Sequence, residues 1–188
     1  MDITYNIPAY SGETQLITLA AAKKQLRIEH DYEDTEIQGF IDAAIAEAES
    51  YLGKLLQPRD MVFGLPAWQT NTTFPIGPVT AVTSVDYLAD GDEDTTNLAT
   101  TGYKLYNFSG NKDVILIKEA IHSTTLEQET LDAVQITATV GYADGTVPKD
   151  IINAILLLIT DKYEFRGEKE TKQNRSSRNL LRPYKQWV

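Results

Sequence analysis

The sequence contains no cysteine among its 188 residues. The chain can therefore form no disulfide, hold no metal through thiolates and use no cysteine nucleophile. Long hydrophobic runs are absent too, since the longest, from Ala154 to Ile159, is far shorter than the roughly 20 apolar residues that cross a bilayer. The first residues lack the basic and then apolar segments of a signal peptide. We therefore expect a protein made and used in the cytosol, with no membrane partner.

The motifs of common catalytic sites are also missing. There is no Gly-x-Ser-x-Gly elbow, Walker loop, dinucleotide fingerprint or His-Glu-x-x-His pair, and the two histidines, His30 and His122, lie far apart. The acidic segment at 90–94 begins like a calcium loop, but Thr95 stands where that loop needs glycine and Thr101 where it needs glutamate. The sequence therefore predicts no catalytic residue, no metal, no cofactor and no enzymatic activity. An enzyme built on either histidine is the weakest alternative.

Charge is plentiful but unevenly distributed. The segment from Arg166 to Val188 holds seven bases and two acids, a net charge of +5. The remaining 10 bases and 25 acids give −15, and the whole chain carries −10. The chain therefore has an acidic body and a basic tail. Such an uneven charge distribution is informative about binding partners rather than about the fold, so it indicates that the tail binds a partner.

The basic tail divides into two parts. Its first part, 166–179, is polar and lacks core-forming residues, which predicts disorder in the free chain. Its last part, Leu180–Trp187, combines apolar, aromatic and basic side chains, which is typical of a binding anchor. The predicted partner-binding residues of the tail are Arg166, Lys169, Lys172, Arg175, Arg178, Leu180, Leu181, Arg182, Tyr184 and Trp187.

A second charged feature is acidic. Seven acids and no base lie between residues 31 and 49, and the early ones favour the positive end of a helix dipole. The stretch is interpreted as a solubilising face, as a surface that meets bases of another subunit or borders a DNA passage, or, least well, as paired carboxylates for hydrolysis. The residues assigned to this acidic face are Asp34, Asp42, Glu47 and Glu49.

Hydrophobic periodicity predicts three helices around a β-rich segment. The first helix begins at the capping residue Thr18, the second runs from Asp31 or Asp34 to Gly53, and the third runs from Pro148 to Gly167. Between them, short runs rich in Thr, Val, Tyr and Phe predict strands. These predicted strands are 61–63, 72–74, 79–88, 103–108, 114–117 and 134–140.

The predicted fold class is therefore α+β. It is a small bundle of three main helices with an inserted antiparallel β module and an extended C-terminal tail. The expected divisions are an N-terminal arm with the first bundle helices (1–57), the β-rich insertion (58–146), the C-terminal bundle helix (147–167) and the basic tail (168–188).

Several short segments follow one another in a distinctive order. None is diagnostic alone, but their order and spacing together are specific. They are Leu19–Arg27, the acidic start His30–Asp34, Ala43–Gly53, Phe74–Val79 with Val82–Val85, Thr139–Tyr142 before Val147 and Pro148, Ile151–Tyr163 and Leu180–Tyr184.

In this order the sequence resembles the phage head–tail connector (adaptor) proteins, in the version with a β-rich insertion. The resemblance implies a dodecameric ring that sits beneath the portal, joins it to a neck, stopper or tail-completion protein, and lets DNA pass through its centre. It also implies a location at the head–tail interface of the virion and a C-terminal region that reaches the portal. The alternative is a nucleic-acid-binding accessory protein that uses Arg175, Arg178, Arg182 and Trp187.

Overall fold

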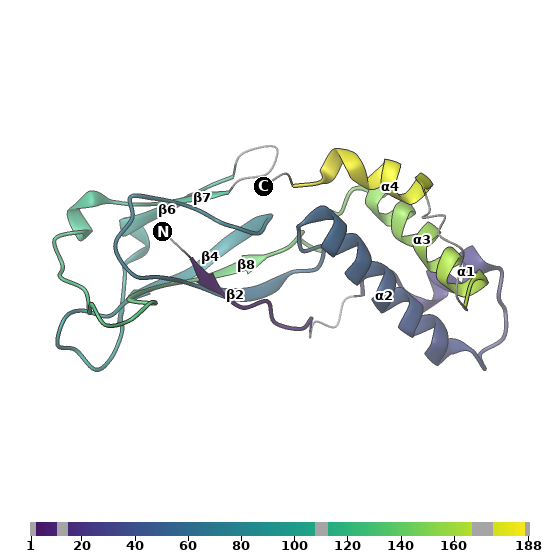
Figure 1. Ribbon diagram of the computed structural model, residues 1–188, viewed down its shortest axis with the longest axis horizontal. Coiled ribbons are helices and arrows are strands. Elements are labelled where there is room, and N and C mark those ends of the chain that lie inside the picture. Colours follow the sequence, from purple (N-terminus) through teal and green to yellow (C-terminus); the bar gives the residue numbers. More distant parts are fainter. Residues whose placement is uncertain (1–2, 11–14, 108–112, 167–174, 187–188) are drawn as a thin grey trace. The chain divides into compact units, whose positions relative to one another are not determined.

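The computed structural model describes residues 3–10, 15–107, 113–166 and 175–186, and the chain divides into two compact units (Figure 1). The β unit comprises Met1–Gly12 with Gln57–Ala143, and the helical unit comprises Glu13–Leu56 with Asp144–Val188. Each unit is therefore built from two separate stretches of chain. The α+β class predicted from the sequence is confirmed.

The described part of the helical unit contains three helices of eight residues or more, and each has a local cause. Helix α1 (Leu19–Leu26) begins as predicted, because the Thr18 hydroxyl accepts the Ala21 N–H at 3.2 Å. Helix α2 (Asp34–Leu52) ends at Gly53, whose φ of 65° places it in the left-handed region that glycine adopts freely. Helix α3 (Lys149–Glu164) follows Pro148 and ends three residues earlier than the predicted stop at Gly167.

The predicted cap of α2 is wrong. Glu33 occupies the cap position and makes no side-chain capping bond. The carboxylates of Asp31 and Asp34 instead bind the Lys23 ammonium, at 2.5 and 2.8 Å. These acids tie the end of α1 to the start of α2, a contact that local helix signals do not reveal.

The core of the helical unit lies between α2 and α3, which run side by side (Figure 1). Both helices repeat apolar residues at intervals of three and four, and these residues are buried. Each large aliphatic side chain contributes about 1.5–3 kcal/mol on full burial. The buried residues are Ile37, Ile41, Ala44, Ile45, Ala48 and Leu52 on α2, and Ile151, Ala154, Ile155, Leu158 and Ile159 on α3.

The expectation of an extended tail needs correction. Residues Arg175–Leu181 form helix α4, and Arg182–Tyr184 continue it as a 3₁₀ turn. Helix α4 packs against α3, and its Leu181 is only 2% exposed. Burial of this side chain provides the energy that orders a segment whose composition alone predicts disorder.

Among its described residues, the β unit forms two antiparallel sheets, and all six predicted strands are present. The larger sheet has the order β1-β2-β8-β4-β5 and the smaller has the order β3-β7-β6. The sequence missed the short edge strand β5. The strands are β1 (Thr4–Tyr5), β2 (Arg59–Leu65), β3 (Asn71–Thr73), β4 (Val79–Tyr87), β5 (Thr96–Asn97), β6 (Tyr103–Tyr106), β7 (Val114–Ile117) and β8 (Val134–Val140).

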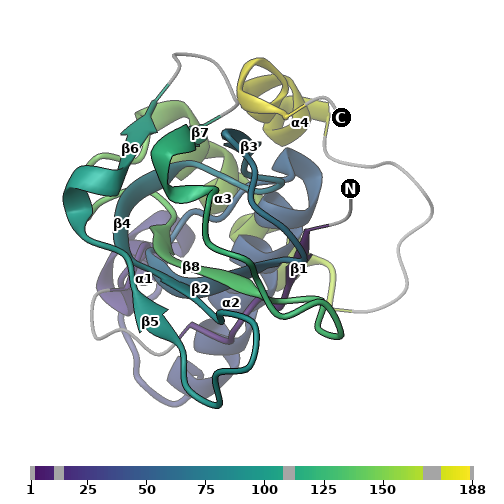
Figure 2. The ribbon, with the colours of Figure 1, turned by 90° about the vertical axis from the view of Figure 1, so that its left-hand side faces the viewer.

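The core of the β unit lies between these two sheets (Figure 2). Strand β8 alternates buried and half-buried residues, and its buried set includes Val134 and Ile136. On β2, Phe63 is fully buried and meets the ring of Phe74, which follows β3, edge to face at 4.9 Å. This aromatic pair joins the larger sheet to the smaller one.

Gly141 follows β8 where the chain passes close to the start of β2. Its φ is 124°, and a Cβ at this position would collide with the carbonyl group of Gln57. Only glycine combines freedom to adopt a positive φ with the lack of a Cβ. Gly141 therefore lets the end of β8 pass close to the backbone that precedes β2.

A buried carboxylate fastens the smaller sheet to the larger one. Asp113, 8% exposed, accepts the Val79 N–H at 2.7 Å and the Asn107 side-chain amide at 3.1 Å. The Asp113 carbonyl also accepts the Phe74 N–H. One residue beside β7 thereby fixes the start of β4 and the end of β3.

We expect Asp113→Ala to destabilise the β unit by about 1–3 kcal/mol, because it leaves the buried Val79 N–H without an acceptor. Urea unfolding followed by Trp68 fluorescence in a Trp187→Phe background measures this directly. Asp94→Ala, an equal truncation in an exposed loop, is the control and should change stability by less than about 0.5 kcal/mol. Equal stability of both variants would contradict the role of Asp113.

Candidate interaction surfaces of the helical unit

The structure places most of the predicted tail residues on or beside α4. Arg175, Arg178 and Arg182 are exposed, whereas Leu181 is buried and Leu180 and Tyr184 are half-buried. Arg166 lies apart from them, just after α3. Lys169, Lys172 and Trp187 lie outside the described residues. The three arginines on or beside α4 are therefore accessible to solvent, whereas Leu181 is used for internal packing.

Polar contacts hold the C-terminal segment on the helical unit. The Gln186 N–H donates to the Leu52 carbonyl at 2.8 Å, at the end of α2. The Tyr184 hydroxyl donates to the Asp150 carboxylate at 3.1 Å, and this bond raises the pKa of Tyr184. Together with Leu181, these contacts fix the segment against both α2 and α3.

The ring of Tyr51, on the last turn of α2, receives two cations from the C-terminal segment. The Arg178 guanidinium lies 5.5 Å and the Lys185 ammonium 4.9 Å from its centroid. Contacts of this kind contribute about 0.5–1 kcal/mol each at exposed sites. Two of the tail's bases are therefore engaged with an aromatic side chain of the same copy.

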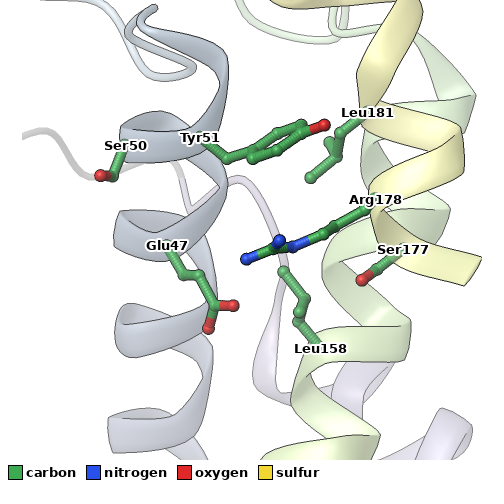
Figure 3. Close-up of a pocket in the computed structure, with 7 residues that line it drawn as sticks. All are labelled: Glu47, Ser50, Tyr51, Leu158, Ser177, Arg178 and Leu181. Atoms are coloured by element: carbon green, nitrogen blue, oxygen red, sulfur yellow. The ribbon is translucent and has the colours of Figure 1, made fainter. Parts of the chain in front are cut away.

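A pocket of about 220 Å³ lies among α2, α3 and α4 (Figure 3). Arg178 reaches across it from α4 and points between Tyr51 and Glu47 of α2. The walls combine an aromatic ring, aliphatic side chains, hydroxyls and both signs of charge, so the pocket suits an amphipathic side chain. Its lining residues are Glu47, Ser50, Tyr51, Leu158, Ser177, Arg178 and Leu181.

Glu33 organises a second cluster, at the other end of α2. Its carboxylate accepts bonds from the Tyr163 hydroxyl and the Arg166 guanidinium, both at 2.7 Å. The bond to Arg166, followed by that to Tyr163, lowers the pKa of Glu33, and the Glu33 carboxylate raises the pKa of both partners. Arg166 also lies 4.5 Å from the Tyr163 ring centroid. The first base of the predicted tail is thus part of an internal ion pair.

An exposed aromatic side chain extends from this cluster. Tyr32 is 78% exposed, and its ring stacks on His30 with centroids 3.7 Å apart and planes inclined by 7°. His30 Nε2 lies 3.7 Å from the Glu33 carboxylate. The turn before α2 therefore holds one large aromatic ring out toward solvent.

All four residues of the predicted acidic face have contacts within the helical unit. Asp34 binds Lys23, as described above, and Asp42 accepts a bond from Gln38 at 3.0 Å. Glu47 pairs with Lys162 at 2.8 Å. The remaining residue, Glu49, accepts the Leu56 N–H at 2.8 Å. Asp42 and Glu47 are nevertheless exposed, so part of the face remains available as a negatively charged surface.

The two histidines occupy different units and different surroundings. His30 belongs to the cluster at Glu33, whereas His122 stacks on Trp68 in the β unit at a centroid distance of 5.8 Å. Within the described ranges, no group of three His, Cys, Asp or Glu side chains could hold a metal ion. No helix in the described part of the chain is long and apolar enough to span a membrane.

Several residues of these surfaces gave no usable signal in the sequence. Tyr51 and Tyr163 fit the apolar period of their helices, which predicts core positions. Glu33 and Arg166 stand 133 residues apart, and no local pattern pairs residues at such a distance. The sequence offered one signal for these contacts, which was the abundance of bases from Arg166 onward. It gave no sign of which residues pair with those bases, because the partners lie far away in the sequence.

Comparison with known proteins confirms the family resemblance. Residues 16–87 match the model of the phage gp6-like head-tail connector protein family. No curated protein sequence matches the chain.

The fold is also that of solved structures. A chain in the neck of an empty gene transfer agent particle, computed with C6 symmetry, is 24% identical with a TM-score of 0.78, over 100% of this chain and 97% of that chain. A chain in the virion of a native gene transfer agent particle is 22% identical with a TM-score of 0.76 over the same shares. A third, in the neck of the native particle computed with C12 symmetry, is 22% identical with a TM-score of 0.68, over 94% of this chain and 95% of that chain.

Because the pKa of Glu33 is lowered in the folded state, its ion pair stabilises the helical unit above about pH 4.5, the value for a free glutamate. This stabilisation is lost as the pH falls through the folded pKa. We therefore expect Glu33→Gln to unfold at a lower temperature than the parent chain at pH 7. The difference should narrow below about pH 4.5, as measured by circular dichroism melts from pH 7 to 2.5. A difference independent of pH would contradict the assigned ion pair.

Proposed function

We propose that this chain is a structural protein of a phage-like virion, a head–tail connector in the neck. The observation that carries the proposal is the agreement of two independent likenesses. The family model covers α1, α2 and strands β2, β3 and β4, and the neck proteins share the fold over the whole chain. A structural connector needs no catalytic residue, which fits a chain without a recognisable catalytic motif.

We further propose that the chain assembles as a ring, and that the ring has twelve copies. Similar chains stand in necks computed with C6 and C12 symmetry, which supports a cyclic assembly. Its place would be the head–tail interface of the virion, after synthesis in the cytoplasm of the host.

The partner on the head side would be the portal, bound through the C-terminal segment. Arg175 and Arg182 are exposed on a helix whose apolar side is already packed, so their charges face outward from a stable support. Basic groups on a rigid element suit an acidic protein surface, and arginine is favoured at such contacts. A neck, stopper or tail-completion protein would bind on the side away from the head.

DNA would pass through the ring without binding tightly. The chain carries a net charge of −10, and Asp42 and Glu47 keep an exposed negative surface on α2. An acidic wall repels phosphates, so it lets DNA slide without adhering. The contacts of Arg178 and Lys185 with Tyr51, and of Arg166 with Glu33, favour a protein partner over the nucleic-acid alternative.

Charge reversal at Arg175 and Arg182 tests the portal contact while leaving the buried Leu181 in place. We expect Arg175→Glu with Arg182→Glu to weaken binding to purified portal by about tenfold or more, because two favourable charge contacts become repulsive. Co-sedimentation with portal over a range of salt concentrations measures this effect.

Lys104→Glu with Lys118→Glu makes the same change in charge on the β unit and is the control. It should leave portal binding near the parent level. Equal binding by both double variants would contradict a portal contact through the tail. Strong, salt-sensitive retention of duplex DNA by the parent chain would favour the nucleic-acid alternative instead.

A further inference from the structure

The turn before α2 presents an exposed aromatic side chain that is already held in position and could bind a partner. Tyr32 is 78% exposed but not loose, because it stacks on His30, and His30 lies beside the Glu33 carboxylate. Glu33 is in turn fixed by Tyr163 and Arg166. A side chain held in one place before binding loses little entropy on binding, so a rigid exposed tyrosine is well suited to a central contact.

Two exposed acidic side chains lie close to Tyr32 in the sequence. Glu29 is exposed, and the Asp31 side chain is 86% exposed although it also binds Lys23. We call Glu29, Asp31 and Tyr32 the acidic knob. The acidic knob combines negative charge with an exposed aromatic ring. A complementary surface would be a pocket large enough for the ring, with basic residues around it.

The pocket among α2, α3 and α4 is such a hollow. Its volume of about 220 Å³ is several times the roughly 30 Å³ that one water molecule occupies, which leaves room for a side chain. Leu158, Leu181 and the Tyr51 ring offer apolar walls, and Ser50 and Ser177 offer hydroxyls. Arg178 lines the pocket, and Arg175 and Arg182 are exposed on the same short segment. Glu47 also lines the pocket, but its carboxylate pairs with Lys162. The net charge around the pocket is therefore positive, and it is complementary to the acidic knob.

Knob and pocket cannot meet within one copy. Tyr32 precedes the first residue of α2 and Tyr51 is near its last, so the length of the helix, about 28 Å at 1.5 Å per residue, separates them. Two different but complementary patches on one chain make a head-to-tail contact between copies, which generates a ring when the rotation closes.

We propose that Tyr32 of one copy enters the α2–α3–α4 pocket of the next copy, with Glu29 and Asp31 facing Arg178. This inference rests on the proposed ring and specifies which surfaces close it. Arg178 serves the contact between copies, and the exposed Arg175 and Arg182 remain for the portal.

The absence of cysteine from the natural sequence allows a direct test. One variant carries Tyr32→Cys and a second carries Ser50→Cys, at the wall of the pocket. The two are mixed with purified portal and oxidised. Because a disulfide requires Cα atoms within about 7 Å, it forms only where the two positions meet. We expect a covalent dimer in the mixture, and little dimer from either variant alone.

The matched control mixes Tyr32→Cys with Thr95→Cys, an exposed position in a loop of the β unit. Dimer yield no higher than in this control overturns the proposed interface. If electron microscopy of that same sample nevertheless shows closed rings, the proposed ring stands and only the proposed contact surfaces are wrong. If the chain remains monomeric beside portal, both the interface and the proposed function fail.

A charge exchange provides the second measurement. Arg178→Glu should raise the concentration at which rings form by about tenfold, because the pocket rim then repels the acidic knob. Adding Glu29→Arg to the same chain should restore most of that loss, whereas adding Glu36→Arg, at an exposed position on the first turn of α2, should restore less. If Glu29→Arg and Glu36→Arg restored ring formation equally, the recovery would reflect net charge alone. That result would contradict a specific contact between the acidic knob and Arg178.

Discussion

The packing of α2 against α3 is the constraint on which the rest of the helical unit depends. These helices come from opposite sides of the β-rich segment in the sequence, and their buried isoleucines, leucines and alanines form one core. The last turn of α2 supplies Tyr51, over which Arg178 and Lys185 of the C-terminal segment lie, and the residues before its first turn supply Glu33 and Tyr32. Both candidate interaction surfaces are thus carried by one helix, and their separation is set by its length.

The charge asymmetry has a different meaning in the folded chain than in the sequence. Part of the basic tail serves internal contacts, since Arg166 binds Glu33 and the cations of Arg178 and Lys185 lie over Tyr51. Part of the acidic stretch also makes internal contacts, since Asp34 binds Lys23 and Glu47 binds Lys162. The exposed Glu29 and Asp31 before α2 and the exposed arginines of the C-terminal segment are opposite in sign, which suits contacts between copies and with an oppositely charged partner.

The sequence predicted those features that follow from local periodicity. The helix start at Thr18, the stop at Gly53 and the six main strands depend on neighbouring residues, and they were found as expected. The order of α4 was not predictable, because Arg175–Leu181 is polar in composition and is ordered by a long-range contact at Leu181. The Glu33 cluster was missed for the same reason. Its members come from two segments, the turn before α2 and the end of α3, that only the tertiary fold brings together.

The central claim is that this chain acts by forming a ring on the portal. Electron microscopy of the purified chain mixed with purified portal tests it most directly. We predict a closed ring of twelve copies stacked on one end of the portal, with an open centre wide enough for duplex DNA. Portal particles that carry no added density, while the chain remains monomeric at concentrations well above that of the portal, would contradict the account.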